Sequence, residues 1–362
     1  MKYYNNKVDF HSHFLPASYY EYLKNYEDEC PDNFNTPEWS EEKHIKTMDS
    51  LGVAYSLISI SSPNLSGADD TTEKDYARRI NNEGASFVAK YPNRLGLIAE
   101  LPLPNVANSL EEAKYALNVL KAKGVGLATH YRGKYLGCAD FEPLMELIND
   151  RKSMVIVHPM KPYGLYGGAN EELPIPAFEF FVDTTRTFVN MVLKDTFNRY
   201  PEIKWVFPHA GAFIPLLSDR LNSFAMIMKL KNPDFHADIF NAMKHVYFDL
   251  AGFPLPKQLQ ILKQNVPSSN IVYGSDGPYT PKTAAIGLAG ALENTDQLTD
   301  EDKEKIFTLN AIDIVPGLSE ILGVSAKTNE ESTEKRRFKR SHLWMRRLIS
   351  ACYIKIANRK NN

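Results

Sequence analysis

Cysteine is scarce in this sequence: three occur among 362 residues, Cys30, Cys138 and Cys352, and none belongs to a C-x-x-C pair. Thiols so widely scattered argue against a disulfide framework and indicate a reducing compartment. No apolar run approaches the roughly 18–20 residues that a membrane span needs, and the N-terminus lacks the basic and apolar regions of a secretory signal. These absences predict a soluble, cytoplasmic protein.

The chain also lacks an overall charge of one sign. It has 42 Lys and Arg against 44 Asp and Glu, a net charge of −2, which gives no electrostatic reason to expect a nucleic-acid partner. No Gly-x-Gly-x-x-Gly or Walker motif follows an apolar run, which argues against a dinucleotide-binding, doubly wound sheet. With 43% hydrophobic residues, the chain is long enough for one large barrel or two medium domains.

What the sequence does contain is a regular alternation of short apolar runs with amphipathic segments. Eight runs have the near-continuous apolar character of buried parallel strands: 8–14, 55–61, 94–101, 124–131, 153–160, 203–210, 246–251 and 271–277. Helical patterns lie between or beside them, at 38–51, 73–90, 109–123, 141–151, 177–200, 213–229 and 256–265. Eight β–α units over about 310 residues predict an α/β protein with a (β/α)₈ TIM barrel, spanning residues 1–324.

The end of the chain differs in composition from the barrel. Residues 325–362 hold eleven Lys and Arg against three Glu, a local charge of +8. After a polar stretch, apolar residues recur at helical spacing: Met345, Leu348, Ile349, Cys352 and Ile356. We therefore expect a basic tail, partly disordered or helical, as a separate segment. We expect its apolar stripe to pack on the barrel or a partner subunit; contact with an anionic membrane surface is the less favoured alternative.

Polar groups gather where the predicted strands end. His11 and His13 stand one residue apart on the first strand, so a period of two places both on one face. His158 ends the fifth run, His209 the sixth and Asp276 the eighth. Active sites of (β/α)₈ barrels lie at the C-terminal ends of the strands, so these side chains are expected to meet there. Three imidazoles and one carboxylate suit a divalent transition ion, with Zn²⁺ first.

For each of these residues, a purely structural role is the alternative to metal binding. A histidine at a strand end often bonds only a backbone carbonyl, and Asp276 in Gly-Ser-Asp-Gly resembles an ordinary turn aspartate. Their joint placement favours the metal site. For His130 on the fourth strand, the structural interpretation is preferred, because the adjoining Tyr131 and Arg132 suit a loop exit.

Four motifs occur in order along the chain: Asp-x-His-x-His on strand one, Val-His-Pro on five, His-Ala-Gly-x-x-x-Pro on six and Gly-Ser-Asp on eight. Together they resemble the metal-dependent amidohydrolase superfamily over residues 7–323, in particular its decarboxylase branch. That branch includes aminocarboxymuconate semialdehyde, γ-resorcylate and 6-methylsalicylate decarboxylases. Three further stretches are most similar to the 6-methylsalicylate group: Leu-Pro-Leu-Pro at 101–104, Phe-Glu-Pro-Leu at 141–144 and Asp-Thr-Thr-Arg at 183–186.

The resemblance implies a role for each residue of the site. It makes His11, His13, His158 and Asp276 the metal ligands and places His209 beside the metal as a non-ligating histidine. One ion, Zn²⁺ or alternatively Mn²⁺, is implied, because the fourth strand lacks the carboxylated lysine that bridges two metals in related hydrolases.

Arg220 matches an arginine of aminocarboxymuconate semialdehyde decarboxylase that reaches the substrate carboxylate of a neighbouring subunit. The resemblance therefore implies a homodimer with Arg220 as a substrate-binding residue. A second carboxylate-binding arginine of that enzyme has no counterpart within Asn33–Pro37, which argues against a dicarboxylate substrate.

The implied activity is a carboxy-lyase reaction on a small aromatic acid, 6-methylsalicylate or a related hydroxybenzoate. Ring protonation before CO₂ departs avoids an aryl carbanion, and the proton donor is either Asp276 or a metal-bound water handled by His209. The competing function is hydrolysis of a lactone or amide on the same barrel, with water activated by the ion. Release of CO₂ without uptake of water discriminates the two. A barrel that only binds or supports other molecules is the least favoured alternative, because all four ligand positions are filled.

Overall fold

The structure, a computed structural model, describes residues 4–28, 30–165, 167–323 and 349–351. Eight parallel strands form one sheet in the order β1-β2-β3-β4-β7-β8-β9-β10. Their bounds are β1 Lys7–His13, β2 Val53–Ser59, β3 Leu95–Ala99, β4 Gly124–Ala128, β7 Met154–His158, β8 Lys204–Phe207, β9 Tyr247–Asp249 and β10 Ile271–Val272. Bridges from Asp9 to Tyr273 and from Ser12 to Gly277 join the last strand to the first. The sheet is therefore closed, and the predicted (β/α)₈ barrel is confirmed.

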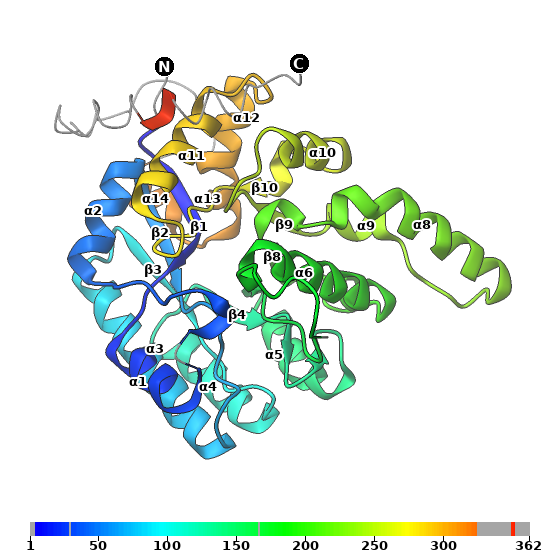
Figure 1. Cartoon of the computed structure of the whole chain (residues 1–362), viewed down its shortest axis with the longest axis horizontal. Helices are drawn as coiled ribbons and strands as arrows, with labels where there is room; N and C mark the ends of the chain where they lie inside the picture. The colour runs from blue at the N-terminus through cyan, green and yellow to red at the C-terminus, as the bar shows by residue number, and fades with distance from the viewer. Residues whose placement is uncertain (1–3, 29, 166, 324–348, 352–362) are drawn as a thin grey trace.

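Helices cover the outside of this barrel (Figure 1). The α-helices are α1 Ala17–Tyr26, α2 Glu41–Leu51, α3 Asp70–Lys90, α4 Val106–Asn118, α5 Glu142–Asp150, α6 Ile175–Leu193, α7 Thr196–Arg199, α8 Ile214–Lys231, α9 Ile239–Lys244, α10 Lys257–Asn265, α11 Lys282–Asn294, α12 Asp300–Glu304, α13 Asn310–Ile314 and α14 Leu318–Leu322. The remaining elements are a two-stranded hairpin, β5 His130–Tyr131 with β6 Lys134–Tyr135, and five short helices. Four of these are 3₁₀-helices, η1 Pro31–Asn33, η2 Ala139–Phe141, η3 His209–Gly211 and η4 Ser268–Asn270, and the fifth is a π-helix, η5 Lys305–Leu309. Local signals explain the boundaries of α2: the Ser40 hydroxyl accepts from the Lys43 N–H, and Gly52 ends the helix at φ 72°.

Most predicted strands are shorter in the structure, and at two predicted elements a residue with positive φ interrupts the regular backbone. The helix predicted over 177–200 is divided into α6 and α7, because Asp195 adopts a left-handed backbone with φ 55°. The eighth strand, predicted over 271–277, ends at Val272. Asp276 has φ 57°, which a regular strand cannot accommodate, and the segment after Val272 pairs with β1 only through the isolated bridges of Tyr273 and Gly277.

Apolar side chains fill the barrel from within. Val8, Phe10, Ile98, Ile156 and Val206 belong to one buried cluster, separate from the larger cluster that joins the strands to the helices. Both faces of the strands are therefore buried, as their near-continuous apolar sequences require. The polar residues of the strands are left to gather at the C-terminal end of the barrel.

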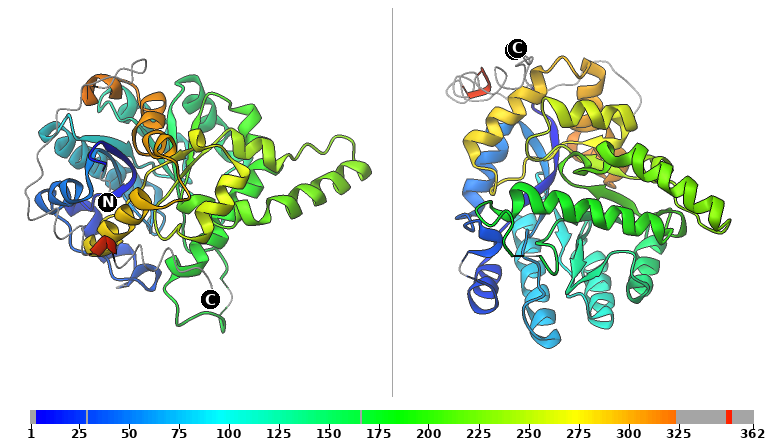
Figure 2. Two further views of the ribbon diagram at one scale, coloured as in Figure 1. Left: turned by 90° about the horizontal axis from the view of Figure 1, so that it is seen from above. Right: turned by 45° about the vertical axis from the view of Figure 1, so that its right-hand side comes forward.

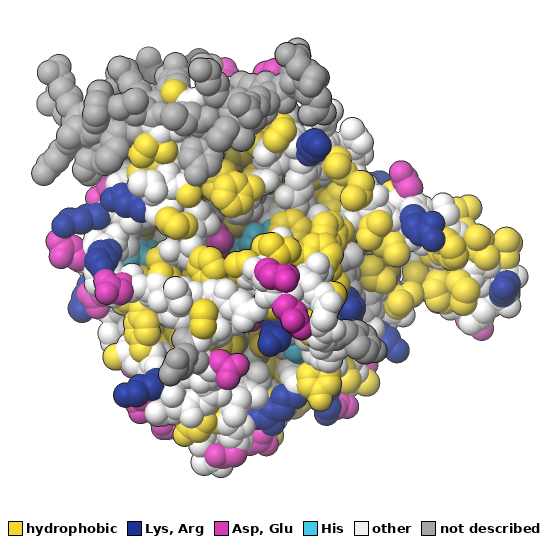
Figure 3. Space-filling view, viewed as in Figure 1, with side chains coloured by type: hydrophobic (Ala, Val, Ile, Leu, Met, Phe, Trp, Pro, Cys, Tyr) yellow, Lys and Arg dark blue, Asp and Glu magenta, His cyan; other side chains and the backbone are white. Residues whose placement is uncertain are grey.

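Helix α8 leaves the body of the molecule as an arm (Figures 1 and 2). The chain then returns through residues 232–238 to α9. Large apolar side chains are exposed along this arm: Leu216, Phe224, Met226, Ile227, Met228 and Leu230. In the space-filling view, apolar side chains are gathered on the visible face of the arm (Figure 3). A helix of a soluble monomer normally buries such residues.

The predicted basic tail, residues 325–362, lies outside the described residues except for 349–351. In that short piece Ile349 packs against the main core, and Ser350 is buried. Its hydroxyl occupies the space that a Cβ would need at Gly290 of α11. Within the described residues, no helix combines the length and apolar character that crossing a membrane requires.

Candidate metal centre

The predicted ligands meet at the C-terminal mouth of the barrel. His11 and His13 lie on β1, and His158 is the last residue of β7. The ring centroids are separated by 5.0 Å for His11 and His13, 5.3 Å for His11 and His158, and 5.0 Å for His13 and His158. One candidate ligand atom from each of the three lies within 4.8 Å of the others. The structure thus brings together three side chains that are separated by up to 147 residues.

Asp276 completes this group from the segment after β10. Its Oδ1 atom lies 3.5 Å from the Nε2 atoms of both His11 and His13. Thr280 donates a hydrogen bond to the other carboxylate oxygen at 3.0 Å. This contact holds the carboxylate with Oδ1 toward the imidazoles.

His209 adjoins the same group from η3, directly after β8. Its ring centroid is 5.0 Å from that of His11, and it forms a second close set of ligand atoms with His11 and Asp276. Phe181 stacks against its outer face at 5.7 Å. All five residues predicted for the site therefore share one location.

Hydrogen bonds fix the orientation of the three candidate ligand imidazoles. The Nδ1 atoms lie 2.9 Å from Asp249 Oδ2 for His11, 3.2 Å from the Ile60 carbonyl for His13, and 2.9 Å from the Pro159 carbonyl for His158. These acceptors assign the proton to Nδ1 and leave the Nε2 lone pair free to bind a metal.

The Nε2 atoms of His11 and His13 are buried and have no hydrogen-bond partner among the described residues. Burying such atoms without a partner is costly, and a metal ion would satisfy both of them together with Asp276. The residues present therefore fit one divalent cation.

Burial sets the protonation of most of the site. It lowers the pKa of His13, lowers that of His158 well below its usual value, and with the help of the neighbouring His11 lowers that of His209 to about 4. Neutral imidazoles are the form that binds metals. Burial also opposes ionisation of Asp276, but the adjacent imidazoles of His13 and His11 outweigh it and hold the pKa of that carboxyl well below its usual range.

Asp249, at the end of β9, is a residue of this centre that the sequence interpretation missed. Besides bonding His11, it accepts the backbone N–H of His209 at 3.0 Å through Oδ1. Burial lowers the pKa of His11, but the charge of Asp249 outweighs that effect and raises it to about 9, so a metal that binds His11 has to displace its Nε2 proton. One buried carboxylate thus orients two histidines. The available signal was an acidic residue at the end of an apolar strand, the same signal that identified His158.

Asp9 is a second missed residue, with a supporting role. Its Oδ1 accepts from the N–H groups of His11 at 3.1 Å and Ser275 at 3.0 Å. These bonds tie β1 to the segment that carries Asp276. Burial raises the pKa of Asp9 to about 7.

Aromatic rings surround the centre. Tyr279 meets His13 edge-on at 5.7 Å, Phe180 meets His158 at 6.0 Å, and Phe181 stacks on His209. Their flat apolar faces favour an apolar, planar ligand next to the metal position. No motif pointed to these rings, because their role depends on how α6 and the loop after β10 fold over the mouth.

The comparisons with known proteins agree with this geometry. Residues 8–317 match the family described as amidohydrolase. The chain belongs to this family. A decarboxylase of Aspergillus niger, yanB, is 30% identical over 330 residues, covering 86% of this chain and 88% of its own. The 6-methylsalicylic acid decarboxylase of Penicillium expansum is 29% identical over 322 residues, covering 87% of this chain and 98% of its own.

Solved structures show the same barrel. The crystal structure of an amidohydrolase II has a TM-score of 0.82 and 37% identity, covering 85% of this amidohydrolase and 99% of its own chain. A dihydroxybenzoic acid decarboxylase from Polaromonas sp. JS666 was solved with manganese and the inhibitor 2-nitroresorcinol. It has a TM-score of 0.74 and 22% identity, and the match covers 86% of this chain and 96% of its own.

Two further residues of this amidohydrolase lie away from the centre. Arg220 is exposed on the arm, and its guanidinium lies over the Phe224 ring at 5.1 Å. His130 is buried and its Nε2 lies 2.9 Å from the Lys161 carbonyl, which agrees with the structural role expected for it.

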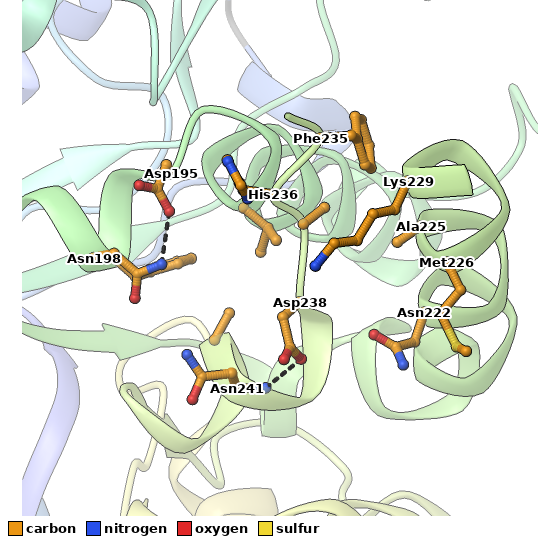
Figure 4. A pocket seen from close by; sticks show the side chains of 14 residues that line it. Asp195, Asn198, Asn222, Ala225, Met226, Lys229, Phe235, His236, Asp238 and Asn241 are labelled. Atoms are coloured by element: carbon orange, nitrogen blue, oxygen red, sulfur yellow. Dashed lines mark hydrogen bonds between the residues drawn. The ribbon is translucent and has the colours of Figure 1, made fainter. Parts of the chain in front are cut away.

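A separate cavity of about 300 Å³ lies at the root of the arm, between α6, α7, α8 and α9 (Figure 4). Two of its polar groups have local structural partners. Asp195 accepts from Asn198 at 2.6 Å, and Asp238 caps α9 through the Asn241 N–H at 2.9 Å. Because both acidic residues of this cavity have local hydrogen-bond partners, their presence does not indicate a bound ligand.

Proposed function

We propose that this amidohydrolase is a metal-dependent, non-oxidative decarboxylase of a small aromatic carboxylic acid, 6-methylsalicylate or a related hydroxybenzoate. The observation that carries the proposal is the buried set of imidazole Nε2 atoms and one carboxylate at the barrel mouth, walled by aromatic rings. Relatives named as decarboxylases, among them 6-methylsalicylic acid decarboxylases, support the reaction.

The reaction replaces the carboxylate of the ring by a proton. Loss of CO₂ from an intact ring leaves a carbanion without stabilisation, so the ring carbon is protonated first. The bond to the carboxylate then breaks, and its electron pair returns to the ring as CO₂ leaves. His11, His13, His158 and Asp276 would hold a divalent ion, whose positive charge would stabilise the anionic substrate when the ion is bound.

Two side chains of the site can hold the transferred proton. His209 has a buried Nδ1 atom without a hydrogen-bond partner among the described residues, so this nitrogen is available to the substrate. Asp276 is the other candidate, but its pKa is held well below its usual range, so its carboxyl is ionised and has no proton to transfer. Burial lowers the pKa of His209 to about 4, so His209 is neutral near pH 7 and would relay a proton from water to the ring. We assign the transfer to His209 and the orientation of the imidazoles to Asp276. Phe181 and Tyr279 hold the ring and exclude water.

An assay of CO₂ release tests the proposal. The protein is loaded with Zn²⁺ or Mn²⁺ and incubated with 6-methylsalicylate and other ortho-hydroxybenzoates, with a chelator-treated sample as the control. We expect CO₂ from at least one acid and its loss after chelation. Hydrolysis of lactones or amides in a parallel panel, with no CO₂ from any acid, would favour the competing function.

For the metal, we propose Zn²⁺, because a ligand set rich in imidazole suits it, with Mn²⁺ as the alternative. Manganese in the related Polaromonas structure supports a divalent ion of this size. Elemental analysis of protein purified without added metal distinguishes the two.

For the assembly, we propose a homodimer built through the arm. The exposed Phe224, Ile227 and Leu230 would be buried by the same surface of a second copy, which is the self-complementary contact of a two-fold dimer. Arg220 lies on this arm rather than beside the imidazoles of its own chain, so we propose that it binds the substrate carboxylate of the partner.

For the tail, we propose that residues 325–362 form a segment distinct from the barrel domain, 1–324, and pack on it. The contacts of Ile349 with the core and of Ser350 with Gly290 favour packing over a membrane surface. A cytoplasmic location follows from the few thiols and remains part of the proposal.

A further inference from the structure

The segment that follows β4 is bonded to the end of β7 on both sides of Pro159. Thr129 comes directly after β4 and is fully buried. Its N–H donates to the His158 carbonyl at 2.9 Å, and its hydroxyl accepts from the Met160 N–H at 3.1 Å. One residue therefore holds the peptide groups before and after Pro159.

The peptide group between Pro159 and Met160 connects the Thr129 hydroxyl to the imidazole ring of His158. Its carbonyl, that of Pro159, lies 2.9 Å from His158 Nδ1 and orients the ring. Its N–H, that of Met160, donates to the Thr129 hydroxyl. A peptide group is planar, so a bond that fixes the direction of the N–H also fixes the direction of the carbonyl. Thr129 thus acts on the His158 ring through one rigid unit.

Helix α6 holds Thr129 in turn. A regular parallel ladder would pair the Met160 N–H with the Thr129 carbonyl. That carbonyl accepts instead from the Thr187 hydroxyl and the Leu136 N–H, each at 3.1 Å. The Met160 N–H can only donate, so the Thr129 hydroxyl accepts from it and gives its own proton to Asp183 Oδ2. Asp183 and Thr187 both lie on α6, and every polar atom of Thr129 has a partner.

We propose that Thr129 is a positioning residue for His158, the third imidazole of the metal centre. Its hydroxyl stands between α6 and the peptide group that orients the ring, so it determines where His158 Nε2 points. Valine has nearly the same shape and would keep the backbone bonds, but it would leave the buried Met160 N–H without an acceptor. This inference rests on the proposed metal site and does not depend on which acid the centre acts on.

Metal binding by the full chain tests this role without any measurement of activity. Zn²⁺ is titrated against a competing chelator, and Co²⁺ in the same site reports the ligand geometry through its visible absorption spectrum. Thr129→Val should weaken Zn²⁺ binding by about tenfold or more and change the Co²⁺ spectrum, because the ring of one ligand is no longer held. Thr129→Ser keeps the hydroxyl, so it should bind Zn²⁺ as the wild type does and give the wild-type spectrum.

Thr308→Val is the matched control. Thr308 is also buried, but its hydroxyl donates at 3.0 Å to the carbonyl of Asn6, which precedes β1. This variant should leave the Zn²⁺ affinity and the Co²⁺ spectrum unchanged. Asp183→Asn should also bind metal normally, because asparagine still offers an oxygen to the Thr129 hydroxyl. Thr129→Ala removes the same hydroxyl with a smaller side chain and is measured beside Thr129→Val, so that either folded variant decides the question.

The outcomes also separate this role from the metal site and from the reaction. Wild-type affinity and spectrum in a folded Thr129→Val or Thr129→Ala would overturn the positioning role alone. A wild type that binds no divalent ion would refute the metal site and this role with it. An absence of CO₂ release from every acid would count against the decarboxylase proposal only, because neither readout uses a substrate.

Discussion

The carboxylate of Asp249 holds two parts of the metal centre at once, the ring of His11 and the backbone of His209. Asp249→Asn should weaken metal binding by about 10- to 100-fold, the usual cost of losing a carboxylate behind a ligating histidine. A metal titration against a competing chelator measures the change. Asp183→Asn is the control, because Asp183 is equally buried but bonds Thr129 and Tyr135. Wild-type affinity in Asp249→Asn would contradict this role.

His158 supplies the third imidazole, and its removal tests the ligand set. The wild type should hold about one equivalent of a divalent metal, as expected for a single site of this kind, and His158→Ala should lose most of it. Elemental analysis after extensive dialysis measures the content. His130→Ala should retain the metal, because His130 is an even more deeply buried imidazole that bonds the Lys161 carbonyl. Full retention in His158→Ala would refute the ligand assignment.

Chain position explains which residues of the site were predicted. His11, His13, His158 and Asp276 each lie at or within four residues of the C-terminal end of a strand, so order along the chain and barrel geometry together bring them to one mouth. Asp249 acts through His11, 238 residues away, and that pairing depends on side-chain packing.

At the scale of elements, the apolar runs predicted all eight strands because both of their faces are buried. Boundaries were less predictable where the backbone leaves the regular regions. Asp195 divides a helix and Asp276 ends a strand, each with positive φ, a conformation that an aspartate tolerates but does not impose. Asp276, His209 and Ala210 share this conformation at the centre itself. Such backbone strain is typical of functional sites.

Helix α2 carries a pH-dependent contribution to stability. His44 accepts from the Trp39 indole N–H at 3.3 Å, and burial lowers its pKa to about 4. Because the folded-state pKa lies below the unfolded value near 6.5, protonation favours unfolding. The contribution is complete above about pH 6.5 and is lost as the pH falls toward 4.

We therefore expect the free energy of unfolding of the wild type to fall by about 2 kcal/mol more than that of His44→Leu between pH 7 and pH 5. Urea unfolding at the two pH values measures this difference. His245→Leu should behave as the wild type, because His245 is exposed. If His44→Leu and the wild type respond identically to pH, His44 does not make this contribution.

At the scale of the whole molecule, the arm formed by α8 takes no part in closing the barrel. Ile227→Glu combined with Leu230→Glu places charge on its apolar surface, so the proposed dimer should dissociate to monomers. Sedimentation velocity at micromolar protein measures the mass. Val119→Glu, at an exposed apolar position on the barrel, should remain dimeric. A monomeric wild type, or a dimeric arm variant, would contradict the assembly.

The proposed reaction replaces the ring carboxylate by a proton from the solvent. The most direct measurement of this replacement is the incorporation of deuterium into the ring when the reaction is run in D₂O. Metal-loaded protein is incubated with 6-methylsalicylate and the dihydroxybenzoates, and the products are followed by NMR. We predict one deuteron at the ring carbon that lost the carboxylate for each CO₂ released, and no reaction in His158→Ala. Product without ring deuterium, CO₂ release that persists in His158→Ala, or no CO₂ from any of these acids would contradict the account.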